Sequence, residues 1–296
     1  MATTKGFQGE IAWVEESTYG DGVKTDSTLL LIANQVINVN VTHNKATLGE
    51  THNIDSPDID DFIMGTKLYG LTTKYYADRE YSSTNCLLYK AMTRVSADLP
   101  SIAFQVGVGV DQTTSSYFNL KGCKAKSISV DTSEDSPVTV SIDWSVKDVA
   151  TSSAATTATA DSITTSPWTY LGASFERNGL SSWGYAVGSV SMKVDNGLQD
   201  VKDIGNSTLI DAAPGIRNAT GTVNVCLTDG GRTYWAECVN ASAHDMELIF
   251  GAAGAPTMKI TGCILNNMDV PLDSSSAIVM TNIPFTGKVP SLENTT

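Results

Sequence analysis

Two segments of this 296-residue chain follow one pattern around a Gly-Cys pair, and this internal repeat constrains the fold more than any other feature. Phe118–Asp131 aligns with Met258–Pro271 at one constant offset. A polar turn and a second run of β-forming residues follow each segment. The matched pairs are Gly122 with Gly262 and Cys123 with Cys263. A repeat of this kind predicts that one structural unit occurs twice.

The match continues upstream of the Gly-Cys segments. Gly70–Asp78 parallels Gly221–Asp229, and each precedes a short stretch that we expect to be helical. The expected helices are Ser83–Thr93 and Arg232–Ala241, which align Cys86 with Cys238. Earlier in each half, apolar residues alternate with polar ones, at Ile37, Val39 and Val41 and again at Val190, Met192 and Val194. A period of two predicts a half-buried strand in both places.

We therefore predict a mainly β protein made of two tandem β-sandwich domains, each with one short flanking α-helix. A single short helix in each unit leaves no room for repeated βαβ crossovers, which favours antiparallel sheets. An Ala/Ser/Thr-rich stretch with almost no charge separates the two units and is either a linker or an exposed hairpin. The predicted division is 1–149 for the first domain, 150–166 for the linker or hairpin, and 167–296 for the second domain.

The composition argues against several classes of function. A net charge of −13 disfavours a protein that grips nucleic acid through clustered Lys and Arg. The five cysteines lack the spacing of a zinc site, and none of the three histidines lies in a recognisable catalytic context. Phosphate-binding Gly-rich loops are absent from the sequence. We predict no catalytic residue, no cofactor and no metal.

The chain also lacks sequence features of membrane insertion or secretion. No apolar run approaches the ~18–20 residues that a membrane span needs. The first residues carry neither an apolar stretch nor a small-residue cleavage site. We expect the protein to fold inside the cell that makes it and to have no membrane contact.

Three segments together resemble a known family. Ile11–Gly22 is similar to the Glu-x-Thr-Tyr-Gly signature near the start of tail tube proteins of tailed phages and archaeal tailed viruses. Val190–Asp200 and Ala213–Val225 resemble the first sheet strands of that family and the strand after its long loop. The order of the segments is a stronger signal than any one of them.

The resemblance implies tail-tube-like domains that assemble into rings, with the inner sheets merged into one closed barrel. The rings stack into a tube in the virion tail, built from protein made in the host cytoplasm. Double-stranded DNA passes through the lumen without sequence-specific binding, and a wall of acidic and neutral groups would let it slide. The implied partners are other copies of the chain, a tape measure protein, a tail terminator and baseplate proteins. A duplicated chain would need three copies for the ring; six is the competing number.

The acidic segment Ile54–Asp61 is the first candidate site. Calcium ligation is one reading of its carboxylates, but the segment lacks the glycine and terminal glutamate of an EF-hand loop, and a solvated loop is favoured. By resemblance it contacts the neighbouring ring, as does its counterpart Gln199–Thr208. The candidate stacking residues are Asp55, Asp58, Asp60, Asp61, Asp200 and Asp203.

Four cysteines form the second candidate site. If each helix packs on its Gly-Cys strand, Cys86 could approach Cys123, and Cys238 could approach Cys263, within their own domains. Reduced, buried thiols are favoured over disulfides in a protein that folds in the cytoplasm.

Two other functions compete with the tube. A β-sandwich adhesin or tail-fibre module would equally fit the Thr- and Ser-rich composition. A glycosidase with paired carboxylates has no support beyond the number of acidic residues.

Overall fold

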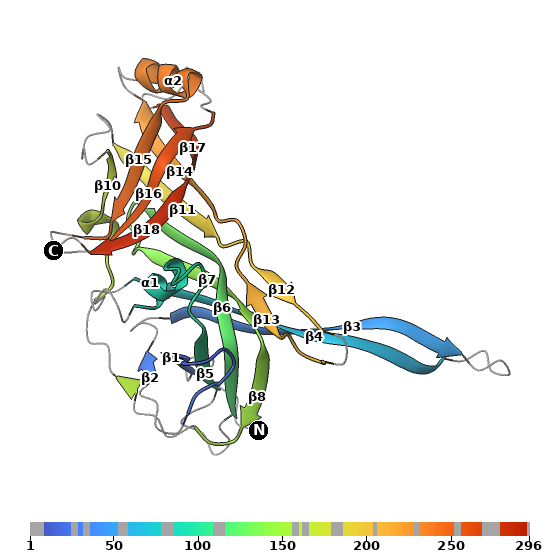
Figure 1. The fold of residues 1–296 in the computed structure, drawn as a ribbon. Helices are drawn as coiled ribbons and strands as arrows, with labels where there is room; N and C mark the ends of the chain where they lie inside the picture. The colour runs from blue at the N-terminus through green and yellow to red at the C-terminus, as the bar shows by residue number, and fades with distance from the viewer. Residues whose placement is uncertain are drawn as a thin grey trace.

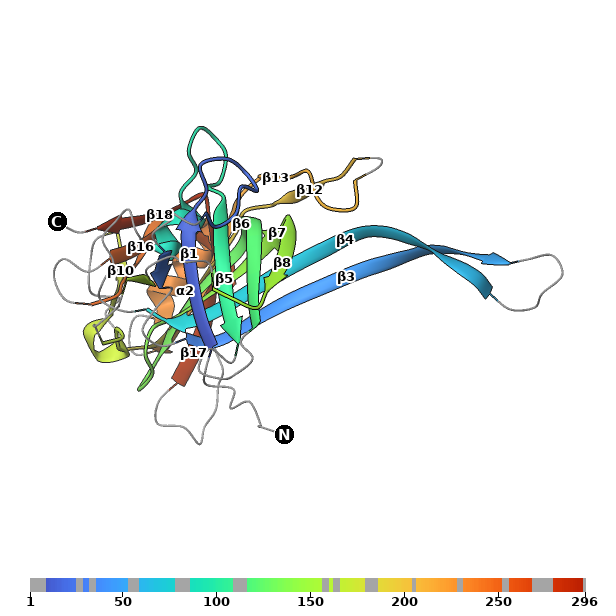
Figure 2. The same cartoon turned by 90° about the horizontal axis from the view of Figure 1, so that it is seen from below.

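The structure is a computed structural model that describes residues 9–24, 29–31, 36–52, 59–77, 86–108, 116–155, 160–161, 166–178, 186–203, 206–227, 231–251, 256–267 and 279–294. The described chain is mainly β, which confirms the predicted fold class. Figures 1 and 2 show an elongated body with a long two-stranded arm projecting from it. No helix among the described residues is long and apolar enough to cross a membrane.

The first half of the described chain contains most of the longest strands. Its elements are β1 (Gly9–Glu15), β2 (Leu29–Leu31), β3 (Val36–His52), β4 (Ile59–Tyr76), α1 (Leu87–Met92), β5 (Ile102–Val108), β6 (Ser116–Ser133), β7 (Thr139–Val146) and β8 (Asp148–Ser152). The predicted boundary at residue 149 falls inside β8, which pairs with β6 of the first half.

The second half has a similar but not identical succession of elements, which includes an added hairpin. Its elements are β9 (Ala160–Asp161), the 3₁₀ turn η1 (Tyr170–Gly172), β10 (Ser174–Arg177), β11 (Val187–Asp195), β12 (Gln199–Val201), β13 (Asp211–Ala213), β14 (Asn218–Leu227), α2 (Gly231–Asn240), β15 (Ala243–Ile249), β16 (Pro256–Leu265), β17 (Val279–Gly287) and β18 (Val289–Asn294). β12 and β13 form the extra hairpin.

Six strand pairings of the first half have a counterpart in the second half, whereas those of β2 with β1 and β9 do not among the described strands. The pairs β1–β5, β3–β4, β4–β7, β5–β6, β6–β7 and β6–β8 correspond to β10–β15, β11–β14, β14–β17, β15–β16, β16–β17 and β16–β18. All of these pairings are antiparallel. The tandem duplication stays a prediction, and the shared order of pairing supports it.

The strand register differs in one place from the alignment of the two halves that the sequence predicted. With the two Gly-Cys pairs superposed, the buried side chain of Trp144 takes the same place as that of Phe285. Trp144 pairs with Leu71, whereas Phe285 pairs with Gly221. Leu71, one residue after the expected Gly70, is therefore the counterpart of Gly221.

The repeated glycines have a conformational role. Gly122 and Gly262 have φ angles of +64° and +60°, which residues with a Cβ rarely adopt. In both halves a register shift adjoins the glycine, between Ile102 and Phe104 on β5 and at the matching place on β15. Such a bulge bends a strand. The bend lets β6 pair with β5 and β8 along its first part and with β7 along its second.

A Gly122→Ala variant should lower the free energy of unfolding by about 2 kcal/mol or more, because an L-residue at positive φ costs about 1–2 kcal/mol. A Cβ at this position would also lie 2.6 Å from Cβ of Lys147. Gly262→Ala is the matched comparison, since its nearest contact is the flexible Cδ of Lys288 at 3.3 Å. Urea denaturation should show the smaller loss for Gly262→Ala. Equal losses would contradict this account of the Gly122 site.

Two sheet layers enclose the core in each half. In the first half, the rings of Phe104 on β5 and Trp144 on β7 meet edge to face with their centroids 5.0 Å apart. In the second half, the centroids of Phe175 on β10 and Phe285 on β17 lie 6.4 Å apart. The buried residues of both halves and of α1 belong to one continuous hydrophobic cluster. Because the halves share this core, they are packed together along their junction.

The arm, formed by β3 and β4, differs from the long loop that the sequence indicated. β4 begins at Ile59, so Asp60 and Asp61 lie on a strand of the arm. Asp55 and Asp58 lie outside the described residues. The backbone N–H of Lys67 on β4 donates to the carbonyl of Ser207, 2.8 Å away, which places the β12–β13 hairpin beside the arm (Figure 1).

Both expected helices are present, with different positions in the molecule. Leu87–Met92 is shorter than the expected Ser83–Thr93, whereas Gly231–Asn240 agrees closely with its prediction. Cys86 directly precedes α1, but Cys238 lies near the end of α2, so these cysteines are not at equivalent helix positions. Figure 1 shows α1 between the two halves and α2 at the far end of the second half.

Candidate functional site: a polar sheet face and the junction beside it

One sheet runs through both halves of the molecule. Its strand order is β3, β4, β7, β6, β11, β14 and β17, all antiparallel. The halves join in this sheet where β6 pairs with β11, from Ser127 opposite Asp195 to Ser133 opposite Ser189. The second half therefore continues the sheet of the first.

Side chains alternate between the two faces of this sheet because a strand has a period of two. Val190, Met192 and Val194 lie on the buried face. The opposite face carries hydroxyl, amide and a few charged groups. Its polar described members on successive strands are Asn38, Asn40, Thr42, Thr72, Lys74, Thr139, Ser141, Asp143, Ser127, Ser129, Asp131, Ser133, Ser189, Ser191, Lys193, Asp195, Asn218, Thr220, Thr222, Asn224, Asn282 and Thr286, and Tyr76, Cys226, Met280 and Pro284 lie on the same face. We call this set the polar face.

Hydrogen bonds between neighbouring strands order part of the polar face. Asp143 accepts from the hydroxyls of Thr72 at 2.8 Å and Ser127 at 2.9 Å. The amide of Asn224 donates to the carbonyl oxygen of Asn282 at 2.8 Å. Three carboxylates and two amines are spread over an otherwise neutral surface, so the face is weakly acidic and holds no cluster of positive charge among the members given above.

Asn196 is the polar centre of the junction between the halves. Its side chain is fully buried, and its amide donates to the carbonyls of Ala91 at 3.2 Å and Ala125 at 2.9 Å. Its side-chain oxygen accepts from Nε of Arg217 at 2.9 Å. Arg94, just after α1, donates to the backbone carbonyl of Asn196 at 2.9 Å. Burial, with the nearby charge of Arg94, lowers the pKa of Arg217 to about 10.

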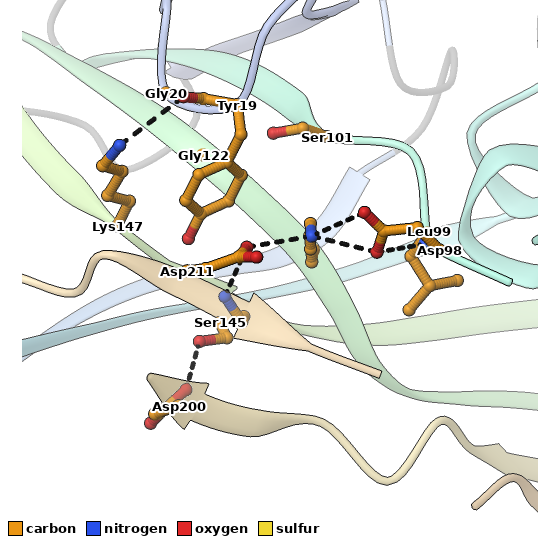
Figure 3. Close-up of polar contacts among 12 residues, drawn as sticks. Tyr19, Gly20, Asp98, Leu99, Ser101, Gly122, Ser145, Lys147, Asp200 and Asp211 are labelled. Atoms are coloured by element: carbon orange, nitrogen blue, oxygen red, sulfur yellow. Dashed lines mark hydrogen bonds and ion pairs between the residues drawn. The ribbon is translucent and has the colours of Figure 1, made fainter. Parts of the chain in front are cut away.

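Lys124 on β6 joins a second set of groups across the junction. Its side chain is buried, and Nζ lies 3.0 Å from a carboxylate oxygen of Asp98 and 3.0 Å from one of Asp211 on β13. Figure 3 shows Asp98 and Asp211 on either side of this contact. Asp200 on β12 accepts from the Ser145 hydroxyl at 2.9 Å. These contacts hold the β12–β13 hairpin against the first half.

The Glu-Ser-Thr-Tyr-Gly segment after β1 folds around its own glutamate. The Glu16 carboxylate accepts from the backbone N–H groups of Gly20 at 3.1 Å, Gly22 at 2.7 Å and Gly122 at 3.1 Å. It also accepts from the hydroxyl of Ser101. A carboxylate with several donors fixes a loop strongly. Glu16 therefore ties this loop to the glycine at which β6 bends.

Tyr19, in the same loop, lies between two amines. Nζ of Lys124 is 4.9 Å and Nζ of Lys147 is 4.7 Å from the ring centroid, within the range of cation–π contacts (Figure 3). The Tyr19 hydroxyl is buried and has no hydrogen-bond partner among the described residues. Burial first, and the charge of Asp211 second, raise the pKa of Tyr19.

The raised pKa of Tyr19 predicts alkaline destabilisation. The unfolded tyrosine ionises near pH 10 while the folded one stays protonated, so stability is present below about pH 10 and falls as pH rises further. Tyr19→Phe keeps the ring and should reduce this fall, with a change at pH 7 within about 1 kcal/mol. Tyr19→Leu, the control, also removes the cation–π contacts and should lower stability at both pH values. The free energy of unfolding is measured by urea denaturation at pH 7 and pH 10.5. If it falls as much between these pH values in Tyr19→Phe as in the wild type, Tyr19 is not the group responsible for the alkaline destabilisation.

The structure places the acidic residues singled out in the sequence at different sites. Asp200 lies in the junction, whereas Asp203 is exposed and accepts from the amide of Asn206 at 3.3 Å. Asp60 and Asp61 lie on the arm, and their side chains are outside the described set. No metal-binding group of His, Cys, Asp and Glu occurs among the described residues. The stacking role stays a prediction.

The five cysteines are thiols in the structure. Cys123 and Cys263 are fully buried, and burial raises the pKa of both, that of Cys263 to about 12. Thiols with raised pKa react slowly at neutral pH because the thiolate is the reactive form. The pairing of Cys86 with Cys123 and of Cys238 with Cys263 stays a prediction.

Sequence reasoning missed the polar face and Asn196. The signal for the polar face was present, since Ser189, Ser191 and Lys193 alternate with the apolar residues that predicted the strand. No local pattern distinguishes Asn196, because its partners are 21 to 105 residues away in sequence.

These features define a class of protein: an elongated, mainly antiparallel β protein with one continuous sheet and an extended polar face. The family model described as phage tail tube protein matches residues 6–287, nearly the whole chain. The chain therefore belongs to the phage tail tube protein family, which confirms the resemblance, and is a structural protein of the virion tail. No curated protein matches the sequence.

Proposed function

We propose that this protein assembles into rings that stack to form the tail tube, with the polar face lining the lumen through which viral DNA enters the host. The family match supports the tube, and the continuous sheet supports the ring. Hydroxyl and amide groups with a slight excess of carboxylates would hydrate the wall without holding phosphates. The composition of the polar face is the observation that carries this proposal.

The edge of β3 supports ring closure by other copies. Among the described residues β3 pairs only with β4, whereas its counterpart β11 pairs with both β14 and β6. An exposed strand edge is a template for another strand. Within the chain, β11 pairs with β6, and their counterparts in the other half are β3 and β16. We propose that β3 of one copy pairs in the same way with the edge formed at β16 of the next copy.

We propose a ring of three copies, in which each chain supplies two tail-tube-like domains, 1–149 and 167–296, joined by 150–166. Repeating the in-chain junction between copies would close the sheet into a barrel and leave no free edge. Six copies, with the second domain partly outside, is the competing ring. The continuity of the sheet through both halves favours three, because both halves then contribute to the wall.

The arm and the adjoining β12–β13 hairpin are the proposed stacking elements between rings. They carry Asp60, Asp61, Asp200 and Asp203, and the arm projects well beyond the body (Figure 2). Tape measure, terminator and baseplate proteins are the proposed tail partners, and the host cytoplasm is the proposed place of synthesis. The family match favours this function over an adhesin or tail-fibre module.

Negative-stain electron microscopy of the purified protein tests the proposal. Rings or hollow tubes with a central lumen are expected over a range of concentrations. A chain that stays monomeric at all concentrations, or binds a glycan as a monomer, would contradict it.

A further inference from the structure

An apolar groove opens on the first half beside the edge of β3 that pairs with no other described strand. It has a volume of about 620 Å³ and lies among β3, β4, β5, β6 and β8. Six of its lining residues are Val39, Val41, Val108, Phe118, Val149 and Thr151. Val108 keeps 44% of its surface exposed, and Thr151 is also exposed. The other four residues are half-buried. Several large apolar side chains are therefore incompletely covered in one place.

The strand register identifies the counterpart of this groove in the second half. The corresponding pairs are Val39 with Val190, Val41 with Met192, Val108 with Phe250, Phe118 with Met258, Val149 with Pro290 and Thr151 with Leu292. In the second half, Met192, Phe250 and Met258 are fully buried, and Val190 is 3% exposed. Another part of the molecule therefore covers the groove of the second half and does not cover the groove of the first half.

Helix α1 of the first half lies at the second groove. It contacts β18, which is the counterpart of β8. Its side chains Leu87, Leu88, Ala91 and Met92 are buried and share the hydrophobic cluster with Val190 and Met258. Figure 1 shows α1 next to the end of β18, between the halves. The helix of one unit thus packs on the groove of the next unit along the chain.

Helix α2 corresponds to α1, and among the described elements it contacts β16 of its own half. Trp235 and Val239 are 53% and 70% exposed. They are four residues apart and so lie on one face of the helix. Figure 1 places α2 at the opposite end of the molecule from β8. The helix therefore cannot reach the first groove of its own chain.

We infer that α2 of one copy docks into the apolar groove of the first half of the neighbouring copy, with Trp235 and Val239 as its contact face. The occupant is a second copy of this chain, because the α1 contact shows how a unit of this type fills that groove. The groove also adjoins the β3 edge, so helix and strand contacts would form one continuous interface. This inference rests on the proposed ring.

Photo-crosslinking tests which surface α2 meets. A benzophenone amino acid replaces Trp235 in the full chain, and assembled rings are irradiated, digested and analysed by mass spectrometry. Crosslinks from position 235 to residues 39–41 or 149–151 of another copy are expected. Rings with crosslinks only to other surfaces would overturn this contact while leaving the ring proposal standing. If the wild-type chain forms no rings, both the α2 contact and the ring proposal would be overturned.

A charge substitution tests whether the contact contributes to assembly. Trp235→Arg should raise the concentration needed for ring formation by about tenfold or more, since buried tryptophans are frequent hot spots of interfaces. Leu171→Arg is the control, because Leu171 is also exposed, at 88%, but lies on η1 and not on α2. Unchanged monomer melting temperatures would show that folding is intact. Rings formed by Trp235→Arg at the wild-type concentration would overturn the inference.

Discussion

An Asn196→Ala variant is expected to lose about 3–5 kcal/mol of unfolding free energy, because each buried polar group left without a partner costs about 1–3 kcal/mol. The substitution removes two donors and one acceptor at a fully buried position. The carbonyls of Ala91 and Ala125 and the Nε of Arg217 would each lose this partner. Urea denaturation at pH 7 measures the loss.

Asn282→Ala is the matched control for Asn196→Ala. Asn282 is exposed on the polar face and accepts one hydrogen bond, from Asn224. Its replacement should cost less than about 1 kcal/mol, because water can satisfy the remaining amide. Similar losses in the two variants would contradict the view that Asn196 holds the halves together.

Proline on β3 is expected to prevent ring formation. Neighbouring strand residues direct their N–H groups to opposite edges, so Val39→Pro and Asn40→Pro affect different edges of β3. One variant should break a bond to β4 and lower the melting temperature. The other should keep the monomer folded but remove a donor from the free edge, and so leave it unable to close the barrel.

The measurement combines thermal unfolding with size-exclusion chromatography of both variants. The variant that melts near the wild-type temperature is the informative one, and it should elute as a monomer where the wild type elutes as a ring. If that variant forms rings as readily as the wild type, β3 is not the edge through which copies join.

The sequence predicted the parts of the fold that depend on local patterns. Alternation at Val190, Met192 and Val194 located β11, and the Gly-Cys repeat located β6 and β16, because a period of two and a glycine at positive φ are properties of short segments. The register could not be predicted in this way. A shift of two residues preserves the buried face, so the sequence paired Ile37 with Val190, whereas the strand pairing matches Val39.

The contacts of the candidate site were even less predictable from sequence than the strand register. The contacts that join the halves, such as those of Lys124 with Asp98 and Asp211, depend on strands brought together from distant parts of the chain. The arm was also missed as strand, because its acidic residues at 60 and 61 are typical of loops but are tolerated where a two-stranded ribbon projects from the body.

The number of chains in one ring tests the central claim most directly. The account predicts that mass photometry of the smallest assembled species gives the mass of three chains, and that averaged electron micrographs show six similar lobes with threefold symmetry. A ring with the mass of six chains would contradict the proposal that each chain supplies two units of the wall.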